Sequence, residues 1–280
     1  MASVFKLALP LALLAASLLP AGVRADGHQE PSAQSPGLPA ALAANPNRPT
    51  DSNSADVLDP GILQWEYGYS REWYGRGAFQ NLIVGEWRFG LVRNMEVRWG
   101  GNPWIRDSVS GAEHEGFGDQ YFSAQYRFHE ANGSAPALAA SYDVTIPAAS
   151  KAQGLGSGRF DHSLAFLASK DVRSFTFDFN ALYNLIGRED SSLRDHNGEF
   201  FLGAQKNIYG PFTLMAELGG ETRLNADGNA SASNLWAIAF RARPRVVLDG
   251  GIEVGITNGA APKRIFFGVT YAVANLYSKH

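Results

Sequence analysis

Hydrophobic and polar residues alternate strictly along Ser174–Asn184. Successive side chains of an extended chain point to opposite faces, so this period of two predicts an amphipathic β-strand. One face would carry Phe175, Phe177, Phe179, Ala181 and Tyr183, and the other Thr176, Asp178, Asn180, Leu182 and Asn184. The first face is unusually aromatic and the second unusually polar, which is typical of a wall between lipid and water.

The same pattern recurs along the chain in segments of about ten residues, a length that suits a tilted membrane strand. Twelve such segments are predicted: Ile62–Glu72, Phe79–Phe89, Met95–Gly101, Asp119–Phe128, Ala137–Ile146, Arg159–Lys170, Ser174–Leu185, Glu199–Lys206, Phe212–Leu224, Asn234–Arg243, Val246–Thr257 and Arg264–Asn275.

The links between these segments alternate in length. Short links fall at residues 91–94, 171–173, 207–211 and around Pro244, and longer ones at 102–118, 148–158, 186–198, 225–233 and 258–263. Short turns at one end and longer loops at the other are typical of outer-membrane barrels with both termini in the periplasm. A soluble lipocalin-like barrel would not need this asymmetry. The predicted fold is therefore all-β, an antiparallel up-and-down transmembrane β-barrel of about twelve strands over residues 61–280.

The first 60 residues differ from the rest. Leu7–Leu19 is an apolar run broken by Pro10, and Val23–Ala25 fits a small-residue cleavage site, so residues 1–25 are expected to be a cleaved signal peptide. Residues 26–60 are rich in Pro, Ser, Asn and Ala and are expected to form a flexible leader on the periplasmic side. The pattern leaves open whether this leader plugs the barrel. The expected location is the outer membrane.

Net charge and the absence of cysteine narrow the range of possible partners and sources of stability. Without Lys6 and Arg24 the mature chain has 22 basic against 27 acidic residues, a net charge of −5, which argues against a nucleic-acid partner. The chain has no cysteine, so an exported protein of this sequence cannot rely on disulfides, and barrel closure is the expected source of stability.

Alternation also assigns the two faces of the wall. A charge facing lipid would cost roughly 2–4 kcal/mol at mid-membrane, so charged positions are expected to point inward. Lipid-facing candidates include Trp65, Tyr67, Tyr69, Met95, Val97, Trp99, Leu214, Ala216, Leu218, Ile252, Val254, Ile256, Ile265, Phe267, Val269 and Tyr271. In Phe79–Phe89 the register stays open, because Glu86 and Arg88 share a face with Leu82 and Val84.

The candidate functional residues are inward charges near mid-strand, expected to line the lumen and to set its width and field: Glu66, Glu96, Arg98, Arg127, Asp143, Asp178, Glu217 and Arg223. Both signs occur, so strong ion selectivity is not expected. The alternative is that these charges pair with each other and only stiffen the wall.

Candidates for catalysis are weak. Asp161, His162 and Ser163 are consecutive, but His162 and Ser163 would point to opposite faces of a strand and could not readily share a proton. His114 lies between two glutamates, and the histidines show no metal-ligand spacing. No cofactor, no metal and no enzyme activity are expected.

Short motifs resemble a proteobacterial outer-membrane family described as "putative MetA-pathway of phenol degradation". They are Arg48–Ser52, Pro60–Gln64 with Glu66 and Gly68, Arg88–Arg98, Gly116–Asp119 followed by Ala124–Arg127, and Ala137–Pro147. The chain departs from the family pattern at Ala148–Ala149, where Thr-Gly is usual, and in a last strand that runs on to His280. The resemblance implies a transporter-like barrel that passes small organic compounds, including aromatic ones.

The predicted function is passive passage of small, including aromatic, organic solutes through the outer membrane. The expected partners are outer-membrane lipid, a small organic solute and the barrel-assembly machinery, with the oligomeric state open. Two alternatives remain: a lipase- or esterase-like membrane enzyme centred on His162, and a structural or adhesive barrel that acts through its loops.

Overall fold

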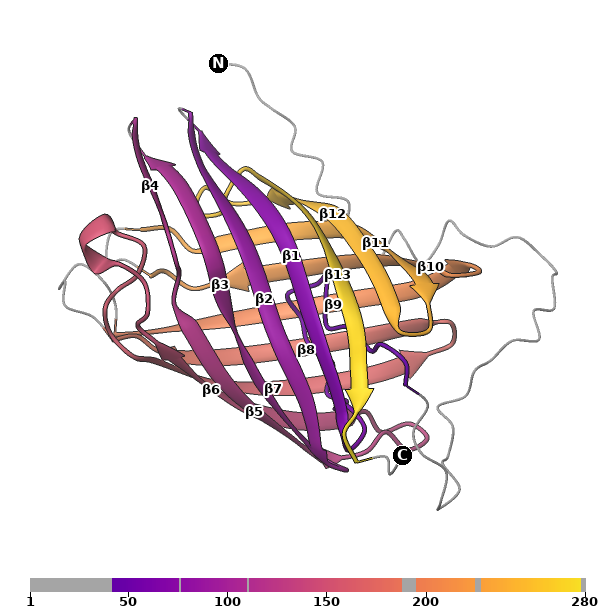
Figure 1. Ribbon diagram of the computed structural model, residues 1–280. Coiled ribbons are helices and arrows are strands. Elements are labelled where there is room, and N and C mark those ends of the chain that lie inside the picture. Colours follow the sequence, from indigo (N-terminus) through magenta and orange to yellow (C-terminus); the bar gives the residue numbers. More distant parts are fainter. Residues whose placement is uncertain (1–41, 76, 110, 188–194, 225–227, 278–280) are drawn as a thin grey trace. The chain divides into compact units, whose positions relative to one another are not determined.

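The computed structural model describes residues 42–75, 77–109, 111–187, 195–224 and 228–277. Over this range antiparallel strands form one sheet that closes into a barrel (Figure 1), which confirms the predicted fold class. The elements are β1 (Ile62–Gly75), β2 (Ala78–Val92), β3 (Met95–Val109), β4 (Ala112–Gly116), β5 (Gln120–His129), β6 (Ala137–Ile146), the short 3₁₀ helix η2 (Lys151–Gln153), β7 (Asp161–Val172), β8 (Phe175–Leu185), β9 (His196–Tyr209), β10 (Phe212–Glu221), β11 (Ser231–Arg243), β12 (Val246–Gly255) and β13 (Lys263–Asn275).

Closure follows from the pairing of β1, which binds β2 on one edge and β13 on the other, while β2 also pairs with β3. β4 and β5 share one edge of β3: β5 pairs with Met95–Gly101 and β4 with Ile105–Val109. The two strands therefore occupy a single position in the wall, which is twelve strands around. A closed barrel leaves no long unpaired edge and satisfies the backbone hydrogen bonds that lipid cannot.

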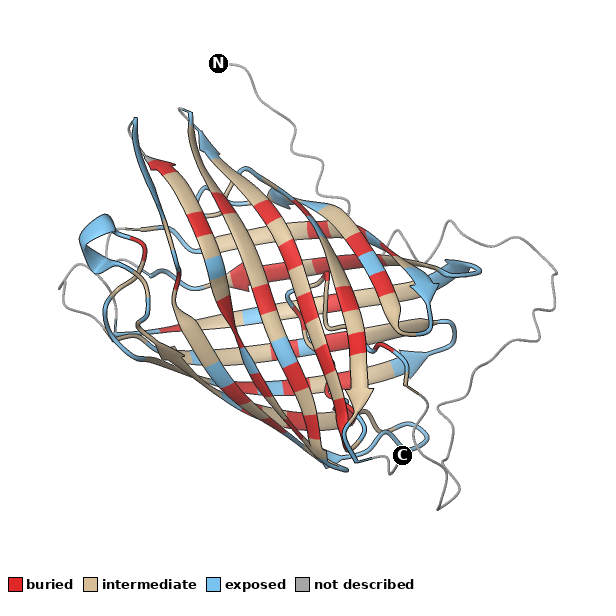
Figure 2. Ribbon diagram, viewed as in Figure 1, coloured by how far each residue is buried: buried red, intermediate tan, exposed pale blue. Residues whose placement is uncertain are grey.

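The period of two becomes an alternation of buried and less buried residues along strands such as β1 (Figure 2). In β8 the inward Asp178 and Asn180 are buried, whereas Phe179 and Tyr183 on the opposite face are exposed. β6 spans the predicted residues Ala137–Ile146. Local alternation therefore predicted both the strand positions and the inner and outer faces of β6 and β8.

The barrel has two different ends. The tight turns at residues 93–94, 173–174, 210–211 and 244–245 lie at the end where β1 begins and β13 ends. Arg173 and Gly210 adopt left-handed φ values of 57° and 51°, as such turns require. This is the periplasmic end in an outer-membrane barrel, and the longer connections lie at the extracellular end.

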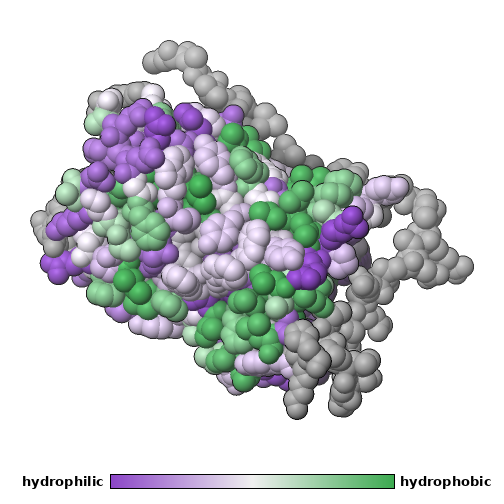
Figure 3. Space-filling model, in the orientation of Figure 1, coloured by the Kyte–Doolittle hydropathy of each residue, from purple (hydrophilic) through white to green (hydrophobic). Residues whose placement is uncertain are grey.

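One predicted loop is wrong. Residues 102–118 were expected to be irregular, but β3 continues to Val109 and pairs back with β4. The cross-strand pair Arg106–Glu113 and the bond from Trp104 Nε1 to Glu115 stabilise this hairpin. In Figure 3 hydrophilic residues gather at the end of the molecule where Figure 1 places the tips of β3 and β4. The hairpin therefore projects beyond the lipid-facing wall.

Other boundaries differ by a few residues. β10 ends at Glu221 instead of Leu224, whereas β2 and β9 are longer than predicted. The predicted loops 186–198 and 225–233 lie partly outside the described residues. Within the part of the chain that the structure describes, no helix is long and apolar enough to cross a membrane.

The open register of Phe79–Phe89 is resolved by pairing. Glu86 lies opposite Glu66, and Arg88 opposite Gln64 and Arg98, all on the inner face. Leu82 and Val84 share that face, and Val84 lines the lumen cavity. The charges of this strand therefore point inward.

Candidate functional site

Residues 42–60, here the plug segment, run through the inside of the barrel. The segment enters beside the periplasmic turn after β11, where Ala44 N donates to Pro244 O at 2.9 Å, and it leaves into β1 at Gly61. Between these points it contacts walls on opposite sides, including Glu66 of β1 and Asn180 of β8. The prediction that residues 26–60 stay on the periplasmic side is therefore wrong for residues 42–60. Residues 1–41, with the predicted signal peptide, lie outside the described range.

The plug segment forms no regular secondary structure, so its backbone depends on the wall for hydrogen bonds. Glu217 accepts from the N–H groups of Asp51 and Ser52 at 3.1 and 2.7 Å, and Glu96 accepts from Leu58 N at 2.8 Å. Further backbone N–H groups donate to side chains of the wall: Asn45 to Gln64, Asn47 and Arg48 to Glu66, Asn53 to Asn180, and Ala55 to Ser169. The polar inner face thus acts as a fixed set of partners for one irregular segment.

Three ion pairs between the plug segment and the wall add to this attachment. Arg48 pairs with Asp249 of β12 at 3.2 Å, and Asp51 with Arg264 of β13 at 2.7 Å. Asp56 pairs with Arg127 of β5 at 2.7 Å, near the periplasmic end. Strands from all around the barrel therefore hold the plug segment.

Glycines of the inner face make room for the segment. Gly68 and Gly268 lie opposite each other on β1 and β13, and a Cβ on either would fall within 2.2–2.4 Å of the Arg48 guanidinium. A Cβ at Gly203 would lie 2.5 Å from Ser52 Oγ, and one at Gly90 would lie 2.1 Å from Asp59 O. Glycine within a strand often marks a close approach of another chain segment, and these positions follow that rule.

Beside the plug segment the wall carries a buried charge network of Glu66, Arg88, Glu96 and Arg98. Arg88 donates to Glu66 at 2.9 Å and to Glu96 at 3.0 Å, and Arg98 Nε donates to Glu96 at 2.6 Å. All four side chains are at most 5% exposed. Glu86 adds a longer contact to Arg88 Nε at 3.9 Å, so each buried guanidinium group has at least one carboxylate partner, as a buried network requires.

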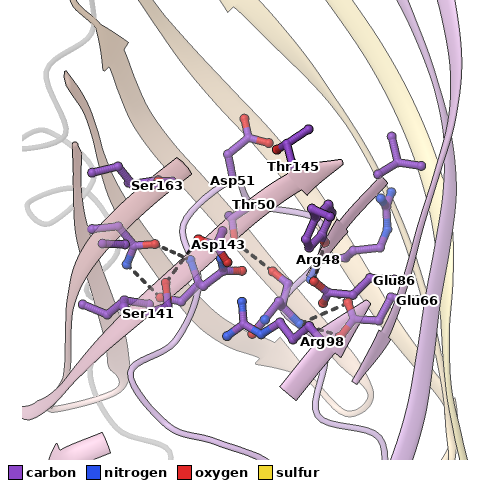
Figure 4. A pocket seen from close by; sticks show the side chains of 18 of the residues that line it. Arg48, Thr50, Asp51, Glu66, Glu86, Arg98, Ser141, Asp143, Thr145 and Ser163 are labelled. Carbon is purple, nitrogen blue, oxygen red and sulfur yellow. Dashed lines mark hydrogen bonds between the residues drawn. The ribbon is translucent and has the colours of Figure 1, made fainter. Parts of the chain in front are cut away.

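Above the plug segment a cavity of about 430 Å³ occupies the middle and extracellular part of the lumen (Figure 4). The plug segment forms one wall through Arg48, Thr50 and Asp51, and the inner faces of β1–β3 and β5–β8 form the others. Most of the lining residues carry hydroxyl, amide or charged groups, and Tyr121 is the aromatic side chain among them. The apolar part of the lining is formed by Val84, Ala165, Leu167 and Leu182. The carboxylates are Asp51, Glu66, Glu86 and Asp143, and the cations are Arg48 and Arg98. A volume of this size is within the usual range for small-molecule sites.

The structure places most of the predicted lumen residues inside the barrel. Glu66, Glu96 and Glu217 bind the plug segment directly, and Arg127 pairs with it near the periplasmic end. Asp178 bonds Ser169, which itself binds Ala55 of the plug segment. Arg98 and Asp143 line the cavity.

Arg223 is the exception among the predicted residues, because it lies in the exposed connection after β10. Sequence reasoning missed Arg88, Asn180, Ser169 and the plug residues Arg48 and Asp51. The inward glycines were the available signal, since strand glycines indicate close approach.

The enzyme alternative centred on His162 fails on geometry. His162 lies on the outer face, where its Nδ1 is 2.7 Å from the Tyr142 hydroxyl, while Ser163 lines the cavity inside. The two side chains are on opposite sides of the wall and cannot exchange a proton.

Comparison with known proteins identifies relatives of the whole barrel. The model of a family described as "Putative MetA-pathway of phenol degradation" matches residues 46–269, from within the plug segment into β13. The crystal structure of an outer membrane channel from Pseudomonas putida F1 matches with a TM-score of 0.62 at 15% identity, covering 80% of this chain and 100% of that chain. A KdgM porin in complex with disordered oligogalacturonate matches with a TM-score of 0.48 at 9% identity, covering 75% of this chain and 99% of that chain.

A comparison with curated proteins finds no match. The first structural likeness shows a shared fold, and the family and the fold together support an outer-membrane, channel-like barrel.

Proposed function

Because this chain belongs to the "Putative MetA-pathway of phenol degradation" family, we propose that it is an outer-membrane channel for the passive passage of small organic solutes, with the plug segment as its gate. In this proposal residues 1–25 are a cleaved signal peptide and passage involves no covalent step, cofactor or metal. The observation that carries it is the polar cavity of about 430 Å³ inside a closed barrel, with an irregular segment between that cavity and the periplasmic end.

The attachment of the plug segment suits a gate. Apart from Ala44 N, which donates to Pro244 O in a turn, the backbone N–H groups that attach the segment to the wall donate to side chains and not to another strand. Each of these bonds can therefore be exchanged for water without breaking the barrel. The ion pairs Asp51–Arg264 and Asp56–Arg127 each include an exposed carboxylate, and such pairs contribute little each. The wall strands keep their ladder hydrogen bonds when the segment moves.

The lining of the cavity indicates the kind of solute. Its carboxylates outnumber its arginines, and the rest of the polar lining is hydroxyl and amide. Such groups favour solutes with hydroxyl or ammonium groups and disfavour anions, because the cavity carboxylate Asp143 forms no ion pair within the described residues. A hydroxylated aromatic compound meets this requirement and agrees with the solute class that the family resemblance implies.

A disulfide lock tests the gate. Ser52 Cβ lies 3.7 Å from the position of a Cβ at Gly203, within the separation that a disulfide spans. The chain has no cysteine, so the Ser52→Cys/Gly203→Cys variant can form a single defined bond. Oxidised protein in liposomes should pass small phenols and sugars more slowly than the same protein after reduction.

The matched controls are wild type and Ser52→Cys, each measured with and without reductant, and neither should respond. Equal solute flux through the oxidised and reduced double variant, with the disulfide confirmed by mass spectrometry, would refute the gate. No flux in either state of a folded barrel would refute the channel itself.

A further inference from the structure

Two cations face outward on the barrel wall near its extracellular end. They belong to the outer cationic cluster, which consists of Arg71 and Trp73 of β1, Phe79 of β2 and Lys263 of β13. Its outward direction follows from alternation: Tyr69, two residues before Arg71, packs against Phe267, which is 60% exposed on the lipid side. Trp73 pairs with both Phe79 and Lys263 across the sheet, so all four side chains share that face.

The aromatic rings hold the cations in place. Arg71 Cζ lies 5.3 Å from the Trp73 ring centroid and 4.2 Å from that of Phe79. Lys263 Nζ lies 5.2 Å from the Trp73 centroid, so two cations flank one indole ring. Cation–π contacts of this kind restrict the cations without neutralising their charge.

The charge of the cluster is not balanced by protein. Within the described residues neither Arg71 nor Lys263 forms an ion pair, and Arg71 Nε is buried without a hydrogen-bond partner. Neighbouring cations do have counter-charges within the protein: Arg264 pairs with Asp51 and Glu253, and Arg106 pairs with Glu113. Two neighbouring positive charges without a counter-charge favour the binding of an anion from outside the chain.

The position of the cluster identifies that anion. On the same face, the next residues toward mid-membrane are Tyr69 and Ile265, which are lipid-facing. The cluster therefore lies where the acyl chains of the outer leaflet end and its headgroups begin. An arginine guanidinium with a nearby ammonium matches the charge and geometry of phosphate oxygens.

We propose that the outer cationic cluster binds the phosphate groups of a phosphorylated glycolipid of the outer leaflet, the lipid A part of lipopolysaccharide. Arg71 and Lys263 contact the phosphate, and the rings of Trp73 and Phe79 pack against the adjoining sugar and acyl chains. This site is independent of the lumen, so its failure would leave the channel proposal untouched, and a closed channel would leave this site intact.

The experiment measures lipid binding to the refolded full barrel in detergent by native mass spectrometry. Wild type should retain bisphosphorylated lipid A, and Arg71→Gln/Lys263→Gln should bind it at least tenfold more weakly, with equal binding of dephosphorylated lipid A by both. The charge-conserving variant Arg71→Lys/Lys263→Arg should keep most of the binding.

Lys206→Gln is the matched control. Lys206 Nζ also lies over an aromatic ring, Phe175 at 4.8 Å, but near the periplasmic end of the wall. This variant should bind lipid A as wild type does. Equal lipid A binding by wild type and the double variant, with folding confirmed by resistance to cold detergent, would overturn the proposal. Inorganic phosphate that competes at the affinity of lipid A would also overturn it, because the site would then take a free ion.

Discussion

The attachment of the plug segment at Glu217 gives the most direct test of how the lumen opens. The Glu217 carboxylate is 2% exposed and accepts from Asp51 N at 3.1 Å and Ser52 N at 2.7 Å. Glu217→Ala removes both acceptors and leaves two N–H groups of the plug segment without partners. The barrel ladder around β10 is untouched, because those bonds are made by the backbone.

The expected magnitude follows from the two bonds. A hydrogen bond to a charged group contributes about 1.5–3 kcal/mol, so the pair contributes about 3 kcal/mol at the lower end of that range. The lower end applies because Glu217→Ala also removes the desolvation penalty of a buried carboxylate, which forms no ion pair in the described residues. At about 1.4 kcal/mol per factor of ten, the ratio of displaced to seated plug segment should rise about 100-fold.

The assay is single-channel recording in planar bilayers. Glu217→Ala should spend a much larger fraction of time in conducting states than wild type, with the same largest conductance. Glu199→Ala is the matched control, because Glu199 is also an inner-face carboxylate of the neighbouring β9 but bonds Asn184 of the wall. An unchanged open fraction for a folded Glu217→Ala barrel, or an equal rise in Glu199→Ala, would refute the reasoning.

Two further predictions concern the wall. Glu96→Gln should lower the free energy of unfolding by about 3–5 kcal/mol, because it removes a buried counter-charge of Arg88 and leaves the buried Arg98 without an ion pair in the described residues. Urea unfolding would measure this, and Glu130→Gln, which breaks the exposed contacts of Glu130 with Arg93 and Arg127, should cost less than about 1 kcal/mol. Asp143→Asn should reduce a cation preference of the open channel, because it removes a cavity carboxylate. A reversal potential equal to that of wild type would contradict this role, and Asp171→Asn at the exposed periplasmic end should have no effect.

The network at Glu96 also shows which inward residues alternation can assign and which it cannot. Glu96 and Arg98 were predicted as inward residues from alternation alone, and the structure buries both. Alternation does not assign Arg88, because its segment carries apolar and charged residues on one face. Pairing with β1 and β3 decides the matter, since it places Arg88 between Glu66 and Glu96.

By itself, the sequence determined the strands, their faces and the barrel class. Alternation is a local property of an extended chain, so Phe179 outward and Asp178 inward could be assigned without knowing any partner strand. The closed antiparallel wall followed from the number of such segments and from their turns.

The tertiary structure alone decided what the inner face binds. The polar residues of the plug segment could be satisfied by water as well as by the wall, so composition predicted only an irregular leader. The segment enters the lumen because Glu217, Glu66 and Glu96, from distant strands, converge on its N–H groups. In the same way Arg71 and Lys263 are far apart in the chain and become neighbours only where the first and last strands close the barrel.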